Sequence, residues 1–374
     1  MKKIKVLTVF GTRPEAIKMA PLVKELEKRK EIESIVCVTA QHRQMLDSVL
    51  EIFQITPDYD LNIMTENQTL VTITNKVLVE FDKIVKQVKP DIVLVHGDTS
   101  TAFVSALVAF YNSVSIGHVE AGLRTYNKYS PYPEEMNRQM IDNMADMMFA
   151  PTNLSKRNLI EENKEANKIY VTGNTAIDAL KITTSKEYKH ELFDWIADSK
   201  LILLTAHRRE NIGTSMKNMF SAINEVIEEN SELKLIYPIH MNPKVREIAD
   251  KIFKENERIK IIEPLDVLGF HHLMNKAYII LTDSGGIQEE APSLGKPVLV
   301  LRDTTERPEG IEAGTLKLVG TDKETIYSNI KLLIDNKEEY DKMSKAVNPY
   351  GDGTASVKIV DEIMREFTIL KRGE

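Results

Sequence analysis

Residues 4–28 have the sequence IKVLTVFGTRPEAIKMAPLVKELEK, and this stretch decides the fold. Its first part, Ile4 to Phe10, is apolar and rich in β-branched residues, which predicts a strand. Gly11 to Glu15 contain a glycine and a proline and predict a turn. Ala16 to Lys28 follow a helical pattern, so the whole stretch forms one strand–turn–helix unit.

The same alternation continues along the chain. We expect further strands at 34–39, 91–96, 114–118, 147–150, 169–172, 200–206, 233–239, 259–262, 277–281 and 297–301, and helices at 44–53, 70–88, 101–111, 134–144 and about 354–371. Apolar strands separated by helices predict parallel sheets that are covered on both faces. The sequence therefore predicts an α/β protein.

The domain organisation follows from length and from one charged stretch. A chain of 374 residues exceeds the size at which one core keeps growing. The stretch 183–198 is the candidate linker, because the strand–helix alternation restarts after it. We expect two doubly wound Rossmann-like domains with a central cleft, at 1–182 and 199–353, and a C-terminal helix at about 354–374 that packs back on the first domain.

Composition narrows the function classes. The formal net charge is -7, which argues against nucleic acid as a partner, because phosphate backbones are bound by clustered Lys and Arg. A single cysteine, Cys37, excludes an internal disulfide and a Cys-based zinc site, and its apolar neighbours predict a buried thiol. With neither a membrane-length apolar stretch nor a signal-peptide pattern, we expect a cytoplasmic protein that does not bind a membrane.

Polar residues gather where the expected strands end. Ligands of open parallel sheets bind at the carboxyl ends of the strands. Those positions carry Gly11-Thr12-Arg13, His96-Gly97-Asp98, His118-Val119-Glu120, His207-Arg208-Arg209-Glu210, His240 and Asp283-Ser284-Gly285-Gly286. A polar site facing the cleft explains this distribution.

Two glycine-containing turns are candidate anion sites. The first turn is neither a GxGxxG dinucleotide motif nor a P-loop, so we expect no NAD cofactor. It places Arg13 and Lys18 near a helix N-terminus, which favours an anion, although a solvated turn explains the charges equally well. In the second turn, Gly285 and Gly286 let the backbone approach a phosphate, and Glu290 follows where it can accept from ribose hydroxyls; close packing is the alternative.

Acids and a dense charged segment suggest acid–base chemistry. Asp98, Glu120 and Glu134 lie at or beside expected strand ends, where burial can tune carboxylates for proton transfer. Each is equally well explained as a helix-capping acid. His207-Arg208-Arg209-Glu210 favours pyrophosphate and acid–base contacts over a solvated loop. His271-His272 lack acids at metal-ligand spacing, so no metal is expected.

The chain carries a series of motifs in a fixed order: Gly11-Thr-Arg-Pro-Glu-Ala-Ile-Lys-Met-Ala-Pro-Leu22, Gln41-His, His96-Gly-Asp-Thr, His118-Val-Glu-Ala-Gly-Leu-Arg-Thr125, Ser130-Pro-Tyr-Pro-Glu-Glu-Met-Asn-Arg138, Thr172-Gly-Asn-Thr, His207-Arg-Arg-Glu-Asn, Asp283-Ser-Gly-Gly-Ile-Gln-Glu-Glu-Ala-Pro292 and Arg302-Asp-Thr-Thr-Glu-Arg-Pro-Glu309. These motifs resemble those of one enzyme family, the non-hydrolysing UDP-N-acetylglucosamine 2-epimerases. Two departures are Tyr132, where many members have Trp, and Asn67, where bacterial allosteric members often have Arg.

The resemblance implies a GT-B-type fold, a homodimer, UDP-GlcNAc and UDP-ManNAc as substrates, and no cofactor. The implied catalytic residues are Asp98, Glu120, Glu134 and His207. The implied substrate and UDP contacts are Arg13, Lys18, Arg138, Phe270, Ser284, Gly285, Gly286, Glu290 and Arg307. A second UDP-GlcNAc, acting as an allosteric activator, would contact Gln41, His42, Gln44, Gln68, Arg208 and His240.

The expected reaction is inversion at C2 by elimination of UDP to a 2-acetamidoglucal, followed by re-addition. Three alternatives remain open at this point. They are a 2-epimerase of another UDP-2-acetamido sugar, a GT-B glycosyltransferase that uses UDP-GlcNAc, and a nucleotide-sugar sensor that does not turn its ligand over.

Overall fold

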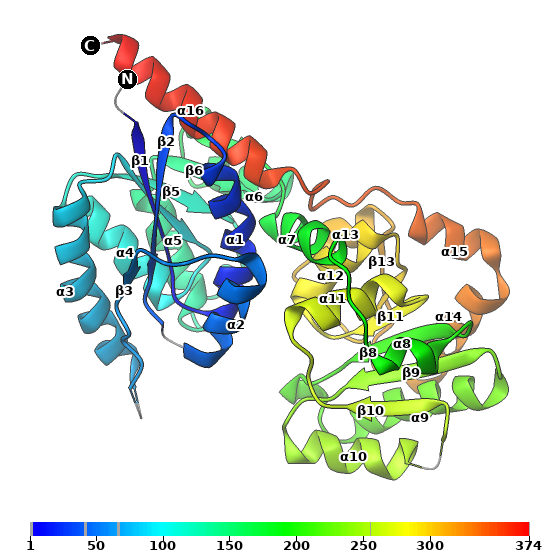
Figure 1. The fold of residues 1–374 in the computed structure, drawn as a ribbon. Coiled ribbons are helices and arrows are strands. Elements are labelled where there is room, and N and C mark those ends of the chain that lie inside the picture. Colours follow the sequence, from blue (N-terminus) through cyan, green and yellow to red (C-terminus); the bar gives the residue numbers. More distant parts are fainter. Residues whose placement is uncertain (1–2, 41–42, 66–67, 255, 374) are drawn as a thin grey trace. The chain divides into compact units, whose positions relative to one another are not determined.

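The computed structural model describes residues 3–40, 43–65, 68–254 and 256–373, and the chain forms two compact units (Figure 1). The first unit comprises Met1–Ala179 with Tyr350–Glu374, and the second comprises Leu180–Pro349. Each contains a parallel β-sheet with helices between its strands. The predicted α/β class with two Rossmann-like sheets is confirmed.

The first unit contains a seven-stranded sheet of order β3-β2-β1-β4-β5-β6-β7. Its strands are β1 (Ile4–Phe10), β2 (Ile32–Val38), β3 (Tyr59–Asp60), β4 (Ile92–His96), β5 (Ser115–Val119), β6 (Met147–Ala150) and β7 (Ile169–Val171). The order reverses between β1 and β4, which are paired in register at Val6 with Ile92. A doubly wound sheet opens its binding crevice at such a reversal.

Helices alternate with the strands of this unit, and one of them, α7, extends past Leu180 into the second unit. They are α1 (Arg13–Glu27), α2 (Arg43–Phe53), α3 (Leu70–Val88), α4 (Ser100–Tyr111), α5 (Glu134–Met144), α6 (Asn153–Glu161), η1 (Ala166–Lys168), α7 (Thr175–Thr184) and α16 (Ala355–Gly373). In α3, the buried residues Ile73, Val77, Phe81 and Val85 recur every four positions, so they lie on one face against the core.

The C-terminal helix α16 packs along α1 (Figure 1). Arg29, just beyond α1, forms an ion pair with Asp361 at 2.9 Å. The buried carboxylate of Asp178 accepts hydrogen bonds from the N–H groups of Ala355 at 3.1 Å and Ser356 at 2.8 Å. These bonds satisfy N–H groups of the first helical turn, which have no partner within the helix.

The second unit repeats the design with a six-stranded sheet of order β10-β9-β8-β11-β12-β13. Its strands are β8 (Lys200–Thr205), β9 (Leu233–Pro238), β10 (Ile259–Ile262), β11 (Ile279–Thr282), β12 (Val298–Val300) and β13 (Leu316–Leu318). Its helices are α8 (Glu191–Ile196), η2 (Arg209–Asn211), α9 (Thr214–Glu229), α10 (Pro243–Phe253), α11 (Val267–Lys276), α12 (Gly285–Glu290), η3 (Ala291–Leu294), α13 (Pro308–Glu312), α14 (Lys323–Asp335) and α15 (Lys337–Ser344). The strand order reverses between β8 and β11.

One predicted segment differs from the structure. The stretch expected as a linker, 183–198, contains helix α8, whose Leu192 and Ile196 are buried in an apolar cluster. The side chain of His190 caps this helix by accepting from the N–H of Leu192 at 3.2 Å. Six residues are too few to show a helical period in the sequence, which explains the difference.

Among the described residues, no helix combines the length and the apolar character that a membrane span needs.

Candidate active site

A buried carboxylate holds the loop after β1 in the first unit. Oε2 of Glu15 accepts from the N–H of Gly11 at 3.1 Å, the N–H of Thr12 at 2.8 Å and the hydroxyl of Thr12 at 2.7 Å. Its Oε1 accepts from the hydroxyl of Thr99, just beyond β4, at 2.7 Å. Glu15 therefore ties together the ends of the two strands that flank the reversal. The local sequence does not indicate this role, because Thr99 is 84 positions away from Glu15.

Burial raises the pKa of Glu15, while its hydrogen bonds to Thr99, Thr12 and Gly11 act in the opposite direction. The two N–H groups and the two threonine hydroxyls all donate to the carboxylate, so the hydrogen-bonding pattern matches the ionised form of Glu15.

Glu120 follows β5 and lies at the centre of a charged cluster. Its side chain is 9% exposed, and Oε1 forms an ion pair with the Lys18 ammonium and accepts from Asn174 Nδ2 at 3.1 Å. Its Oε2 lies 3.7 Å from His96 Nε2. The backbone of Glu120 is left-handed, with φ of 70°, a conformation that is uncommon for a non-glycine residue and that occurs often at functional sites.

Asp98 follows the neighbouring strand, β4, and is paired with a cation from α5. Its Oδ2 lies 2.8 Å from Arg138 Nη2, and its backbone carbonyl accepts from Asn137 Nδ2 at 2.8 Å. Burial raises the pKa of Asp98; the Arg138 guanidinium opposes this shift and the Glu120 carboxylate adds to it. A carboxyl group with a raised pKa can exchange a proton nearer neutral pH.

The remaining predicted residues of the first unit lie beside this pair. Glu134 is the first residue of α5, is half-buried, and adds to the raised pKa of Asp98. Arg13 is the first residue of α1 and is also half-buried. Burial lowers the pKa of His96 to about 3, so this imidazole is neutral at physiological pH. The structure thus places Lys18 and Asp98 near Glu120 and pairs Arg138 with Asp98.

In the second unit, the buried carboxylate of Asp283 binds the loop at the point where the strand order reverses. Oδ2 of Asp283 accepts from the N–H groups of His207 at 2.8 Å and Arg208 at 2.9 Å. The hydroxyls of Thr205 and Thr282, the last residues of β8 and β11, are hydrogen-bonded at 2.7 Å. Asp283 thus has the same local role that Glu15 has in the first unit.

The loop after β11 carries the predicted phosphate-binding turn. Ser284 is the N-cap of α12, and Gly285 and Gly286 form its first turn. Arg307 Nη2 lies 3.9 Å from where a Cβ on Gly285 would be, and Glu290 Oε1 lies 4.0 Å from the corresponding position on Gly286. The two glycines of this turn thus lie beside a guanidinium and a carboxylate.

Two contacts here were not anticipated. The Arg307 guanidinium forms an ion pair with the buried carboxylate of Glu289. Glu290 Oε2 lies 3.6 Å from Nε2 of the buried His271, whose Nδ1 is hydrogen-bonded to the Thr183 hydroxyl at 2.7 Å. Residues from α7 and α11 therefore help to orient the predicted ribose contact. No local motif joins these positions in the sequence.

The other predicted residues of the second unit lie nearby in the fold. The rings of His207 and His240 stack with centroids 5.5 Å apart and planes at 13°. Arg208 Nε donates to the carbonyl of Asp283 at 3.0 Å. Phe270, on α11, is partly buried and packs against the apolar cluster beneath α12.

Arg302 is held by an internal ion pair. Its Nη1 and Nη2 atoms donate to the two carboxylate oxygens of Glu306, at 2.9 and 3.1 Å. The hydrogen bond and charge of Arg302, with a smaller contribution from the Arg208 guanidinium, lower the pKa of Glu306 to about 2.

Part of the predicted allosteric set lies outside the described residues. Gln41, His42 and Asn67 do, and so does the side chain of Gln44. Gln68 lies just before α3 and is half-buried. Arg208 and His240 are the members of this set whose surroundings in the second unit are described above.

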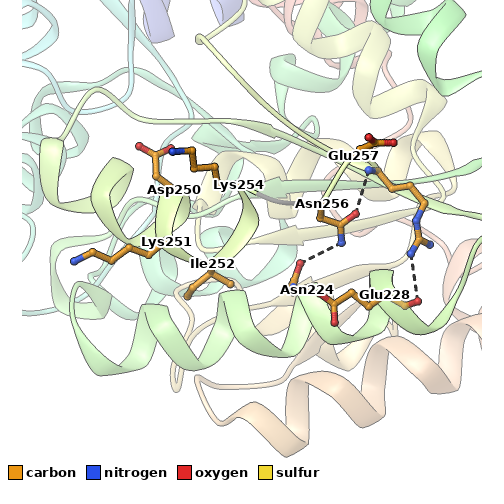
Figure 2. Close-up of a pocket in the computed structure, with 9 residues that line it drawn as sticks. Asn224, Glu228, Asp250, Lys251, Ile252, Lys254, Asn256 and Glu257 are labelled. Carbon is orange, nitrogen blue, oxygen red and sulfur yellow. Dashed lines mark hydrogen bonds between the residues drawn. The ribbon is translucent and has the colours of Figure 1, made fainter.

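A polar hollow of about 550 Å³ is lined by residues of α9, α10 and the segment before β10 (Figure 2). It contains none of the predicted site residues. Asn256 Nδ2 donates to Asn224 Oδ1 at 3.2 Å, and Arg258 donates to the carbonyls of Glu228 at 3.2 Å and Asn230 at 2.6 Å. Arg258 thus donates to carbonyl groups at the C-terminal end of α9 and caps that helix, which gives this region a structural role.

Comparisons with known proteins agree over nearly the full chain. The family model described as UDP-N-acetylglucosamine 2-epimerase matches residues 24–364. A Bacillus subtilis protein named UDP-N-acetylglucosamine 2-epimerase is 62% identical over 367 residues, which are 98% of this chain and 97% of that protein. A crystal structure of the Neisseria meningitidis UDP-GlcNAc 2-epimerase bound to UDP-GlcNAc has a TM-score of 0.87 and 50% identity, covering 97% of this chain and 100% of that one. A structure of S. aureus MnaA with UDP has a TM-score of 0.89 and 56% identity, with 98% and 97% covered.

Replacing Glu15 tests whether the buried carboxylate holds the first strand-end loop. Glu15→Ala leaves the N–H groups of Gly11 and Thr12 without an acceptor, so we expect the free energy of unfolding to fall by about 3 kcal/mol. Glu15→Gln keeps one acceptor oxygen and should cost less. Urea denaturation measures both, and Glu27→Ala, at a half-exposed position of the same helix, is the control. Equal losses for the alanine and glutamine variants would contradict this role.

Proposed function

The chain belongs to the UDP-N-acetylglucosamine 2-epimerase family, and from this premise we propose that it interconverts UDP-GlcNAc and UDP-ManNAc by inverting C2 of the sugar. The observation that carries the proposal is the cluster of Asp98 and Glu120, on adjacent strand ends, with Lys18 and Arg138 as their counter-ions. Such a cluster supplies paired proton-transfer groups, which inversion of a C–H centre requires.

The chemistry proceeds through elimination and re-addition. The C2 hydrogen is not beside a carbonyl, so its direct removal as a proton is difficult. A base takes the C2 proton while the C1–O bond breaks, the electron pair forms the C1=C2 double bond, and UDP leaves with the electrons of the C1–O bond. A proton is then delivered to the opposite face of C2 as a UDP oxygen attacks C1 again. No net oxidation occurs, so the scheme needs no redox cofactor.

In this scheme, residues of the first unit carry the proton transfers. Asp98, Glu120 and Glu134 are the candidate acids and bases. The raised pKa of Asp98 makes its carboxyl group easier to protonate than an ordinary aspartate, while the Lys18 ammonium pairs with the Glu120 carboxylate. The two acids therefore have different environments, a condition that favours opposite proton-transfer roles.

Residues of the second unit bind the nucleotide in the proposal. The Ser284 hydroxyl and the N–H groups at Gly285 and Gly286, with the Arg307 guanidinium, stabilise the diphosphate as negative charge develops on it. Glu290 accepts from the ribose hydroxyls. On the resemblance, Arg13, Lys18 and Phe270 are further UDP contacts, and His207 belongs to the catalytic set.

We also propose, on the resemblance, that the enzyme is a cytoplasmic homodimer and that a second UDP-GlcNAc activates it. The stacking of His207 on His240 supports the second part, because it places a proposed catalytic ring against a proposed activator contact.

Solvent exchange at C2 tests the proposed reaction. Proton NMR of UDP-GlcNAc with the enzyme in D2O, without NAD or added metal, should show UDP-ManNAc with deuterium at C2. Asp98→Asn, Glu120→Gln and Glu134→Gln should each reduce the exchange by about 100-fold or more, because each removes a proton-transfer group. Glu161→Gln, at an exposed position of α6, is the control. Full exchange in all three variants, or unchanged UDP-GlcNAc with the wild type, would overturn the scheme.

The pH profile tests the part played by Asp98. Arg138 opposes the burial that raises the Asp98 pKa, so Arg138→Gln should raise that pKa further. The limb of the kcat/KM profile that Asp98 controls should then move to higher pH: the acidic limb if the reaction needs the carboxylate, the alkaline limb if it needs the acid. Arg157→Gln, at an exposed position of α6, should leave both limbs in place. Two unmoved limbs in Arg138→Gln would exclude Asp98 as a titrating participant.

UDP affinity tests the nucleotide site of the second unit. Arg307→Ala removes a charged donor beside Gly285, so we expect the Kd for UDP, measured by calorimetry, to rise at least about tenfold. Arg246→Ala removes a surface guanidinium that pairs with Glu263 in the same unit, and it should leave the Kd unchanged. The assignment fails if both variants bind UDP equally well.

A further inference from the structure

His118, in β5, is fully buried and makes two short hydrogen bonds through its ring. Its Nδ1 lies 2.6 Å from Oδ1 of Asp142, and its Nε2 lies 2.8 Å from the backbone carbonyl oxygen of Gly97. A carbonyl oxygen and an ionised carboxylate only accept hydrogen bonds. Both ring nitrogens must therefore donate, which a neutral imidazole cannot do because it carries a single N–H.

The surroundings of Asp142 support a charged ring. Oδ2 of Asp142 lies 2.7 Å from Nη2 of Arg124, whose fully buried guanidinium also bonds Glu162 at 2.6 and 2.7 Å. Burial alone would raise the pKa of Asp142, but a protonated His118 and the Arg124 guanidinium lower it below its ordinary value, which keeps Asp142 an ionised acceptor. With His118 as an imidazolium, two cations balance two carboxylates, as a buried ionic network requires.

The contact to Gly97 connects this network to the acid cluster. The N–H of Gly97 donates to the carbonyl of Val119 at 2.9 Å, and its carbonyl accepts from His118. Both polar groups of Gly97 are thus held by adjacent residues of β5. Asp98 is the next residue after Gly97, and Glu120 is the next residue after Val119. The backbones that carry the two acids are therefore fastened to each other through His118.

We propose that His118 is a positioning residue that, as an imidazolium held by Asp142, fixes Asp98 relative to Glu120 for proton transfer at C2. The ring itself does not contact the substrate in this role. The protonation part of the proposal rests on geometry alone. The kinetic part rests on the proposed epimerisation, so the two parts are tested separately.

The first experiment measures the protonation of the ring. The full-length enzyme is labelled with ¹⁵N-histidine, and the His118 signals are assigned by their loss in His118→Gln. We expect two one-bond N–H couplings for this ring at neutral pH. A ring with one protonated and one bare nitrogen would overturn the imidazolium, whether or not the enzyme epimerises UDP-GlcNAc.

The second experiment separates the two hydrogen bonds. A Gln amide reaches the position of Nε2 and can still donate to Gly97, whereas an Asn amide reaches the position of Nδ1 and can donate only to Asp142. We expect His118→Asn to lower kcat about 100-fold with little change in KM, as misplacement of a reacting group does. His118→Gln should lose less than about tenfold.

These measurements distinguish a positioning role of His118 from a role in packing alone, and both from a failure of the proposed epimerisation. UDP binding counts the folded enzyme in each variant, so kcat is expressed per binding site. Equal kcat values per site in wild type and both variants would overturn the positioning role and assign His118 to packing alone. If His118→Asn does not fold, a kcat for His118→Gln that is more than about 100-fold below wild type would equally overturn it, because the bond to Gly97 is kept. A wild type without C2 exchange would refute the proposed function and leave the NMR result to decide the protonation.

Discussion

In each unit a buried carboxylate holds the backbone where the strand order reverses, and the position of the candidate site residues depends on these two groups. Glu15 binds the loop after β1 and the hydroxyl that follows β4, and Asp283 binds the loop after β8. Parallel strands leave their last N–H groups unpaired at one edge of the sheet, where ligands bind. A buried carboxylate that accepts hydrogen bonds from these N–H groups fixes the loop, so that the other polar groups of the loop can face solvent or a ligand.

The two units apply this device to different chemistry. In the first, the reversal is followed by acids that are each paired with a cation, Glu120 with Lys18 and Asp98 with Arg138. In the second, it is followed by glycines and guanidinium groups. In the proposed function, the same strand order carries an acid–base set in one half of the chain and an anion-binding set in the other, so the chemistry depends on the loops and not on the sheets.

Much of the fold could be predicted because it is encoded locally. Apolar runs such as Ile4–Phe10 identify buried parallel strands, and the end of a strand identifies the edge of the sheet where a site can form. The pairing of side chains could not be predicted in this way. Lys18 and Glu120 are separated by 102 positions, and periodicity gives the face of an element but not its partner. For this reason the local sequence does not indicate the buried hydrogen bonds of Glu15, Asp283 and His118.

The arginines near the proposed nucleotide site form ion pairs with carboxylates of the same unit. This pairing affects the rate at which an anion would reach the site. Arg302 is neutralised by Glu306 and Arg307 by Glu289, and the whole chain carries a formal net charge of -7. Such a surface has little long-range attraction for a negatively charged ligand. Nucleotide capture would then proceed at an ordinary diffusional rate that depends weakly on ionic strength, and selectivity would arise after the encounter, from how long the correct ligand stays bound.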